Sequence, residues 1–213
     1  DYNGWNIWYS ASQLKVRVRT GGTSSDMATG KVLDLNQWYH IAWARDGSTS
    51  KVYVDGIIVF DSTTAGYLVA TTAGRPLDIG KSADTTSGDY FQGYMDEIRI
   101  TNGITRYTPS IERYANTFVA KGDTGDAFTA LQIQSNGAKS GAGYSDGLNR
   151  TGYNTGAATI GGTPTWVSTV GDPFGGANTA LYFNGTEQLV WADHSEFEFG
   201  TDVDFTIENK SFK

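Results

Sequence analysis

Apolar and polar residues alternate with a period of two in several short segments of this chain, and glycine-containing turns separate those segments. Residues 14–19 read Leu-Lys-Val-Arg-Val-Arg, which puts apolar side chains on one face of a strand and basic ones on the other. Asp55-Gly56 predicts a hairpin, because both central residues of a type I′ turn need positive φ. No amphipathic helix longer than a turn or two is visible. The pattern therefore predicts an all-β protein with two facing antiparallel sheets.

The composition excludes several classes of function. Of the 213 residues, 38% are hydrophobic, which is enough for a sizeable core without disulfides. Cysteine is absent, which excludes a disulfide scaffold and any Cys-based metal or redox site. The formal net charge of -7 argues against a nucleic-acid partner, because phosphate binding needs a basic surface. No uninterrupted apolar run is long enough to predict a membrane span.

Several segments resemble one known family. Residues 36–45 (Asn-Gln-Trp-Tyr-His-Ile-Ala-Trp-Ala-Arg) and 52–56 (Val-Tyr-Val-Asp-Gly) are similar to the centre of laminin G-like and pentraxin-like jelly rolls. Residues 91–100 (Phe-Gln-Gly-Tyr-Met-Asp-Glu-Ile-Arg-Ile) resemble that family's closing strand. Three segments near the end of the chain resemble its opening: 180–185, 197–200 and 204–208. The resemblance implies an antiparallel jelly-roll β-sandwich of the concanavalin A-like/laminin G-like superfamily.

The order of these segments predicts the domain organisation. The family's closing half comes first in this chain and its opening half comes last. We therefore predict that residues 1–118 are the C-terminal part of a first sandwich, and that residues 119–213 are a linker and the N-terminal part of a second. The alternative is one circularly permuted sandwich, since permutation is tolerated where termini lie close together. The chain starts at Asp1 rather than Met and its last strand pattern begins near its end, so we expect both ends to continue in a longer protein.

A narrower resemblance follows the closing strand. Residues 99–109 (Arg-Ile-Thr-Asn-Gly-Ile-Thr-Arg-Tyr-Thr-Pro) are similar to a run in laminin G-like domains of tailed-phage structural proteins, although the Phe-x-Pro of that run is missing after Pro109. The resemblance implies a virion-surface or extracellular module: a tail-fibre, tail-tip or capsid-decoration domain. The expected partners are other subunits of a homo-oligomer and a host glycan. The alternative is a bacterial secreted or cell-surface carbohydrate-binding adhesin.

The same superfamily includes glucanases, so hydrolysis has to be considered. A retaining glycosidase needs two carboxylates about 5 Å apart, and the Glu-x-Asp-x-x-Glu run with which the glucanases supply them is missing here. Asp96 and Glu97 are adjacent on a strand expected to alternate strictly, with Ile98 on the Asp96 face, so their carboxylates should point to opposite faces. Glu196 and Glu198 share a period of two but alternate with phenylalanines, which are more simply a core face. We therefore predict that the chain is not an enzyme.

Two sets of residues are candidate ligand contacts. A carbohydrate site would use aromatic platforms, and the candidates are Trp5, Trp8, Tyr9, Tyr67, Tyr90 and Trp191. Jelly-roll lectins often bind Ca²⁺ through loop oxygens, of which Ca²⁺ takes six to eight, and the candidate ligands are Asp84, Asp89 and Asp96. The alternative for each aromatic residue is a place in the core or in a cross-strand pair. The alternative for Asp96 is a hydrogen bond to backbone or to arginine.

Overall fold

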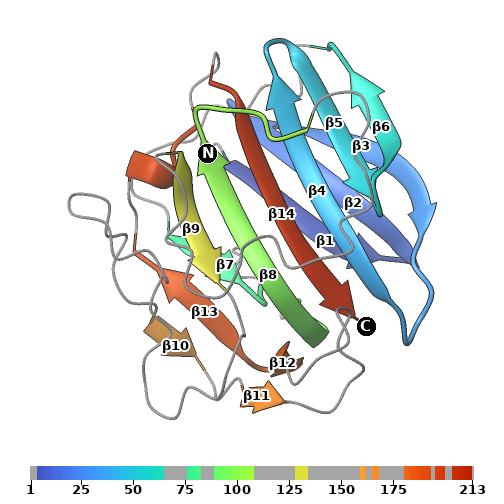
Figure 1. Cartoon of the computed structure of the whole chain (residues 1–213), viewed down its shortest axis with the longest axis vertical. Coiled ribbons are helices and arrows are strands. Elements are labelled where there is room, and N and C mark those ends of the chain that lie inside the picture. The colour runs from blue at the N-terminus through green and yellow to red at the C-terminus, as the bar shows by residue number, and fades with distance from the viewer. Residues whose placement is uncertain are drawn as a thin grey trace.

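In the computed structural model, most of the described segments are β-strands, and all the strand pairs are antiparallel (Figure 1). The residues described are 4–64, 76–82, 89–107, 128–133, 159–161, 165–167, 180–192, 195–199 and 203–212. The one helical element among them is a single 3₁₀ turn, η2 (Ser195–Phe197). The prediction of an all-β antiparallel sandwich is confirmed. No helix in these ranges is long and apolar enough to cross a membrane.

The largest sheet has eight strands. Its order is β11 (Thr165–Val167), β12 (Ala180–Asn184), β8 (Gln92–Asn102), β14 (Phe205–Phe212), β4 (Trp38–Asp46), β5 (Thr49–Val54) and β6 (Ile57–Ser62), with β9 (Thr129–Ile133) also paired to β8. β5 and β6 are joined through Asp55-Gly56, as the hairpin signal predicts. Asp55 and Gly56 have φ values of 51° and 80°, so this turn has the positive φ that a type I′ hairpin needs.

Two smaller sheets complete the sandwich. One has the order β1 (Gly4–Ser10), β2 (Gln13–Thr20) and β3 (Thr23–Val32), and lies behind the large sheet in Figure 1. The other has the order β10 (Thr159–Gly161), β13 (Gln188–Trp191) and β7 (Leu77–Ile79). One core joins all three sheets: it includes Val16 of β2, Trp43 of β4, Phe205 of β14 and Leu189 of β13. The face of the large sheet that turns away from this core is called the outer face below.

The strand at the centre of the large sheet, β14, comes from the end of the chain. It pairs with β4 along its whole length, from Phe205 opposite Arg45 to Phe212 opposite Trp38, and with β8 on its other side. Strands from both sides of the predicted 118/119 boundary therefore share one sheet, as they would in the permuted alternative. The division into parts of two domains stays a prediction.

The expected strict alternation of β8 is wrong, because the strand contains a bulge. Glu97 has a φ of 50°, and the pairing with β14 shifts by one residue between Arg99 and Asp96. The Asp96 carboxylate accepts a hydrogen bond of 2.7 Å from the Glu97 N–H, which satisfies that donor at the bulge. The extra residue moves Ile98 to the core face, while Asp96 lies opposite Lys210 on the outer face.

Candidate carbohydrate-binding site

Four aromatic residues form a continuous row across four neighbouring strands of the outer face. Tyr182 of β12 lies opposite Tyr94 of β8, Tyr94 lies opposite Phe212 of β14, and Phe212 lies opposite Trp38 of β4. All four side chains are half-buried. Successive side chains of a strand point to opposite faces of the sheet. In these strands the alternate side chains face the core, so the four rings lie on the outer face. This set is called the aromatic row.

The rings of the aromatic row are in contact but are not coplanar. The ring centroids of Tyr182 and Tyr94 are 4.9 Å apart at an interplanar angle of 36°. Tyr94 and Phe212 are 5.7 Å apart at 74°, and Phe212 and Trp38 are 5.5 Å apart at 52°. Tilted and edge-to-face pairs at these distances are favourable for aromatic rings. The row is therefore held in place by its own contacts and by the strand register.

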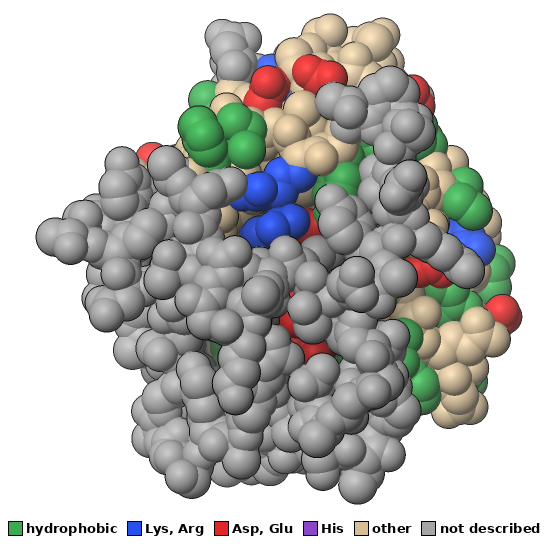
Figure 2. All heavy atoms as spheres, in the orientation of Figure 1, with side chains coloured by type: hydrophobic (Ala, Val, Ile, Leu, Met, Phe, Trp, Pro, Cys, Tyr) green, Lys and Arg blue, Asp and Glu red, His purple; other side chains and the backbone are tan. Residues whose placement is uncertain are grey.

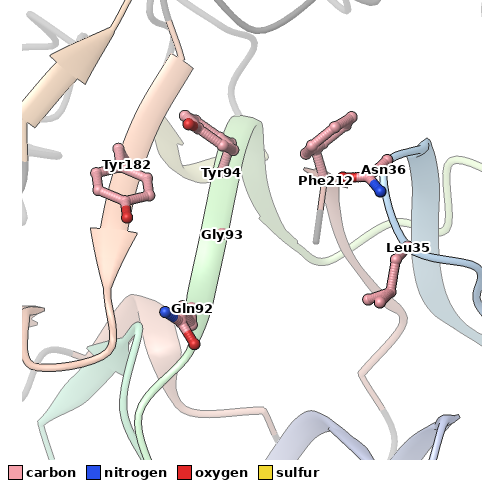
Figure 3. A pocket seen from close by; sticks show the side chains of 7 residues that line it. All are labelled: Leu35, Asn36, Gln92, Gly93, Tyr94, Tyr182 and Phe212. Carbon is pink, nitrogen blue, oxygen red and sulfur yellow. The ribbon is translucent and has the colours of Figure 1, made fainter.

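A groove with a volume of about 480 Å³ lies along three of these rings. Figure 3 shows Gln92 and Tyr94 on one side of it, Leu35 and Asn36 on the other, and Phe212 between them. The complete lining is Leu35, Asn36, Gln92, Gly93, Tyr94, Tyr182 and Phe212. It combines aromatic surface with two amide side chains and contains no charged residue. Binding pockets for uncharged ligands typically have this mixture of apolar walls and a few polar groups.

Local backbone geometry shapes both walls of the groove. Asn36 has a φ of 62°, in the left-handed region that asparagine tolerates better than most residues. This turn, just before β4, leaves the Leu35 side chain 62% exposed at the rim. On the opposite wall, Gly93 has a φ of 148°, a conformation that residues with a Cβ rarely adopt. The groove therefore depends on a turn residue and a glycine as well as on the aromatic rings.

The other end of the outer face is covered by the segment that follows β8, residues 103–107, called the strap below. In Figure 1 it crosses in front of β14. The Gly103 N–H donates to the Asp204 carbonyl at 2.8 Å, and the Arg106 N–H donates to Thr206 Oγ1 at 2.9 Å. The Arg106 guanidinium donates to Thr101 Oγ1 at 2.7 Å and to Thr129 Oγ1 at 3.1 Å. The strap thereby ties together β8, β9 and β14.

Tyr107, the last described residue of the strap, packs on the outer face as a buried ring. Its ring lies 5.7 Å from that of Tyr53 and 5.9 Å from that of His40. Together with Ala42 and Ala44 of β4, the two tyrosines form a small buried cluster. Burial raises the pKa of the Tyr53 phenol, and its hydroxyl donates to the Tyr107 carbonyl at 3.4 Å. Figure 2 shows basic side chains gathered over β8 and β14 in this part of the face.

A buried charge network lies beneath Tyr107. Glu208 of β14, which is only 1% exposed, accepts a hydrogen bond of 2.5 Å from Arg99 Nε. Its other carboxylate oxygen is 3.3 Å from His40 Nε2, and the Tyr107 hydroxyl is 3.4 Å from the same nitrogen. A charge buried this deeply is tolerated only when it is paired and hydrogen-bonded. The network therefore connects β4, β8 and β14 in the protein interior and offers no accessible catalytic carboxylate.

The predicted aromatic candidates are not gathered in the groove. Trp191 is 0% exposed, so its prediction as a sugar platform is wrong: its ring belongs to the core. Trp5 and Tyr9 of β1 pack against that core, and the Tyr9 hydroxyl donates to the Leu33 carbonyl at 2.7 Å. Trp8 is half-buried, with the Arg17 guanidinium 5.0 Å from its ring centre.

The last two aromatic candidates lie in or near the segment before β8. Tyr90 is half-buried beneath Lys81 Nζ, which is 5.3 Å from its ring centre, and does not line the groove. Tyr67 lies outside the described residues. The sequence did not lead us to predict Trp38, Tyr94, Tyr182 or Phe212 as carbohydrate contacts. The available signal was their position between core-facing residues in strands, but only the pairing of distant strands shows that they are neighbours.

The three predicted Ca²⁺ ligands also have separate outcomes. Asp96 is 3% exposed and makes the backbone hydrogen bond described at the bulge, which is the alternative considered for it. Asp89 is exposed, and Asp84 lies outside the described residues. Within the described ranges, no group of three or more His, Asp or Glu side chains is arranged to hold a metal ion. Ca²⁺ binding through Asp84 and Asp89 stays a prediction.

The antiparallel sheets packed on one core are consistent with a concanavalin A-like β-sandwich. Residues 1–105 match the family model described as the concanavalin A-like lectin/glucanases superfamily. The matched residues contain β1 to β8 and the start of the strap, including Trp38 and Tyr94 of the aromatic row. No curated protein and no solved structure matches the chain. The match fits carbohydrate-binding or adhesion modules in general.

Proposed function

We propose that this chain is a non-enzymatic adhesion module of a virion surface, and that it binds a host glycan in the groove of the outer face. The observation that carries the proposal is the groove lining, in which Tyr94, Tyr182 and Phe212 lie beside the amides of Asn36 and Gln92. Sugar rings have apolar faces that stack on aromatic side chains. Their hydroxyl groups pair with amides, which both donate and accept hydrogen bonds.

The state of three described carboxylates near the outer face supports a binding role over hydrolysis. Glu208 is paired with Arg99 and His40, and Asp96 accepts a hydrogen bond from the bulge. The Asp204 carboxylate accepts a hydrogen bond of 2.7 Å from the Gly47 N–H. A retaining glycosidase needs two carboxylates about 5 Å apart with access to the scissile bond. None of these three groups lines the groove.

The support for a virion surface is the resemblance of residues 99–109 to a run in tailed-phage structural proteins. In the described part of this run, Arg106 and Tyr107 hold the strap against the outer face. The expected partners are neighbouring subunits of the same particle and a glycan of the host surface.

A glycan array with the purified chain tests the binding function. We expect binding that Tyr94→Ala removes and Phe60→Ala leaves intact, because Phe60 of β6 is a half-buried aromatic residue that packs against the core and does not line the groove. The array is run with and without added Ca²⁺, which tests the calcium prediction at the same time. An array without hits contradicts the proposal, and so does turnover of laminarin by the chain.

Mass spectrometry of purified particles tests the location. We expect the chain to be recovered as a repeated structural subunit. Recovery only from secreted or cell-surface material of a bacterium, together with glycan binding, would instead support the bacterial adhesin. Recovery only from soluble cell extract contradicts both locations.

A further inference from the structure

The aromatic row extends beyond the groove. Trp38 is not part of the groove lining, yet its ring is 5.5 Å from that of Phe212, which is. The four rings lie on consecutive strands β12, β8, β14 and β4. Because neighbouring strands are about 4.8 Å apart, the row spans roughly 14 Å across the sheet. This is longer than a site for one terminal sugar needs to be.

We propose that the site takes a linear, neutral glycan chain that lies across β12, β8, β14 and β4, with Trp38 as a further contact residue. This inference rests on the proposed function and deepens it. Successive sugars lie along the row, so that Tyr182 and Trp38 contact different units of one chain. Tyr94 and Phe212 contact the units between them.

The ring orientations select a single chain over a flat surface. Binding to a crystalline polysaccharide face needs aromatic rings in one plane, whereas the neighbouring rings of the row are inclined by 36°, 74° and 52°. A twisted row suits a soluble chain whose successive sugars turn relative to one another. The preferred ligand is therefore a soluble oligosaccharide and not an ordered sheet of chains.

The side chains around the row select a neutral chain. All seven residues that line the groove are uncharged. Recognition of a carboxylated or sulfated sugar typically uses Arg or Lys in direct, charge-assisted hydrogen bonds. The buried Arg99 is already hydrogen-bonded to Glu208, and Arg106 to the hydroxyls of Thr101 and Thr129. The formal net charge of -7 also disfavours an anionic ligand at long range.

Calorimetric titration with laminari- and chito-oligosaccharides, from disaccharide to hexasaccharide, tests the inference. For the series that binds, we expect affinity to rise with chain length until the row is covered, and then to level off. We expect Trp38→Ala to lower the affinity for the longest chain by up to about tenfold, as the loss of one aromatic contact would do. The same variant should leave disaccharide binding unchanged.

Two further variants keep the test independent of folding. Trp38→Phe retains an aromatic ring beside Phe212 and should restore most of the length dependence, while thermal unfolding followed by circular dichroism checks that each variant is folded. Phe60→Ala, at a half-buried aromatic residue outside the groove, is the matched control and should bind every oligosaccharide as the wild-type chain does.

The outcomes separate the inference from the function on which it rests. Affinity that is independent of chain length, or an equal effect of Trp38→Ala on short and long chains, overturns the inference and leaves glycan binding standing. Array hits confined to anionic glycans would also overturn the inference and leave glycan binding standing. The absence of any bound glycan, on the array and in both oligosaccharide series, overturns the inference and the proposed function together.

Discussion

Where β8 ends and β14 begins, the strap covers the outer face, and Tyr107 closes over His40 and Glu208. Where β8 begins and β14 ends, the same strands carry the aromatic row, whose rings are half-buried beside a groove. The two regions belong to one face of one sheet and share three strands. Within the described ranges, they differ in whether a following segment of chain packs on them, and this difference separates a stabilising end of the face from the end proposed to bind a glycan.

The chemistry of the two regions follows from their burial. The covered end contains a carboxylate held between Arg99 and His40, an arrangement that needs a full set of partners because water is excluded. The groove end contains amides and aromatic rings, which can remain at the surface without a charged partner. Substitutions at the covered end should therefore change stability first, and substitutions in the row should change binding first.

The largest effect is expected from Glu208→Ala. The substitution leaves the Arg99 guanidinium buried without its counter-charge, which should lower the free energy of unfolding by about 3–5 kcal/mol. Urea unfolding measures this loss. The double variant Arg99→Met/Glu208→Met should recover most of it, because it removes both charges. A loss under about 1 kcal/mol for Glu208→Ala would show that the network does not hold the covered end together.

Tyr107→Ala should have the next largest effect. Removing this buried ring uncovers Ala42, Ala44 and Tyr53 and should lower the free energy of unfolding by about 3 kcal/mol. Tyr107→Phe keeps the ring and loses only the hydroxyl contact to His40, so about 1 kcal/mol is expected. Oligosaccharide binding, measured at a temperature where both variants are folded, should not change. A weakened affinity would mean that the two ends of the face are coupled.

Tyr94→Ala should affect glycan affinity more than stability, the reverse of what is expected for Tyr107→Ala. Loss of its cross-strand partners Tyr182 and Phe212 should lower the free energy of unfolding by about 1 kcal/mol. Glycan affinity should fall by tenfold or more, because this ring contacts both neighbours at the centre of the row. Unfolding curves and titrations on the same sample measure both quantities. A stability loss as large as that of Glu208→Ala, with unchanged affinity, would make the aromatic row a packing feature.

The smallest effect concerns an exposed ion pair, Arg17–Asp26, on the β1–β3 sheet. Arg17 donates two hydrogen bonds to Asp26, at 2.5 and 2.9 Å, and holds the pKa of that carboxyl below its ordinary value. Because the pKa is lower in the folded state, the stabilisation is present above the unfolded value of about 4 and is lost as pH falls through the folded value. Asp26→Asn should therefore cost under about 1 kcal/mol at neutral pH and nothing in strong acid. Unfolding measured across this pH range checks the sign, and an equal cost at both pH values would contradict it.

Local alternation was enough to predict the class of fold and several strands. Leu14, Val16 and Val18 are buried, and Lys15 and Arg17 between them are half-buried, as the period of two requires. Alternation failed on β8, because nothing in the sequence marks the bulge at Glu97. A bulge depends on how a strand fits its neighbours, and those neighbours are distant in the chain.

The candidate site was less predictable than the fold for a related reason. Trp191 and Tyr94 both occur in strand-like segments, and composition cannot tell which ring faces the core. The aromatic row joins residues 38, 94, 182 and 212, whose proximity depends entirely on the register of β4, β8, β12 and β14. Register is a long-range property, and a slip of one residue would turn each of these side chains to the opposite face.

The central position of β14 has a consequence for biosynthesis. His40 and Glu208, which meet across β4 and β14, are 168 residues apart in the chain. At about 5–20 residues per second, the ribosome needs on the order of 10 s or more to make the second partner after the first. During that interval β4 and β8 have no strand between them, and such unpaired edges are prone to associate with other chains. The nascent protein should therefore depend on chaperones until β14 is released, and it should fold slowly, as sheets closed by distant strands do.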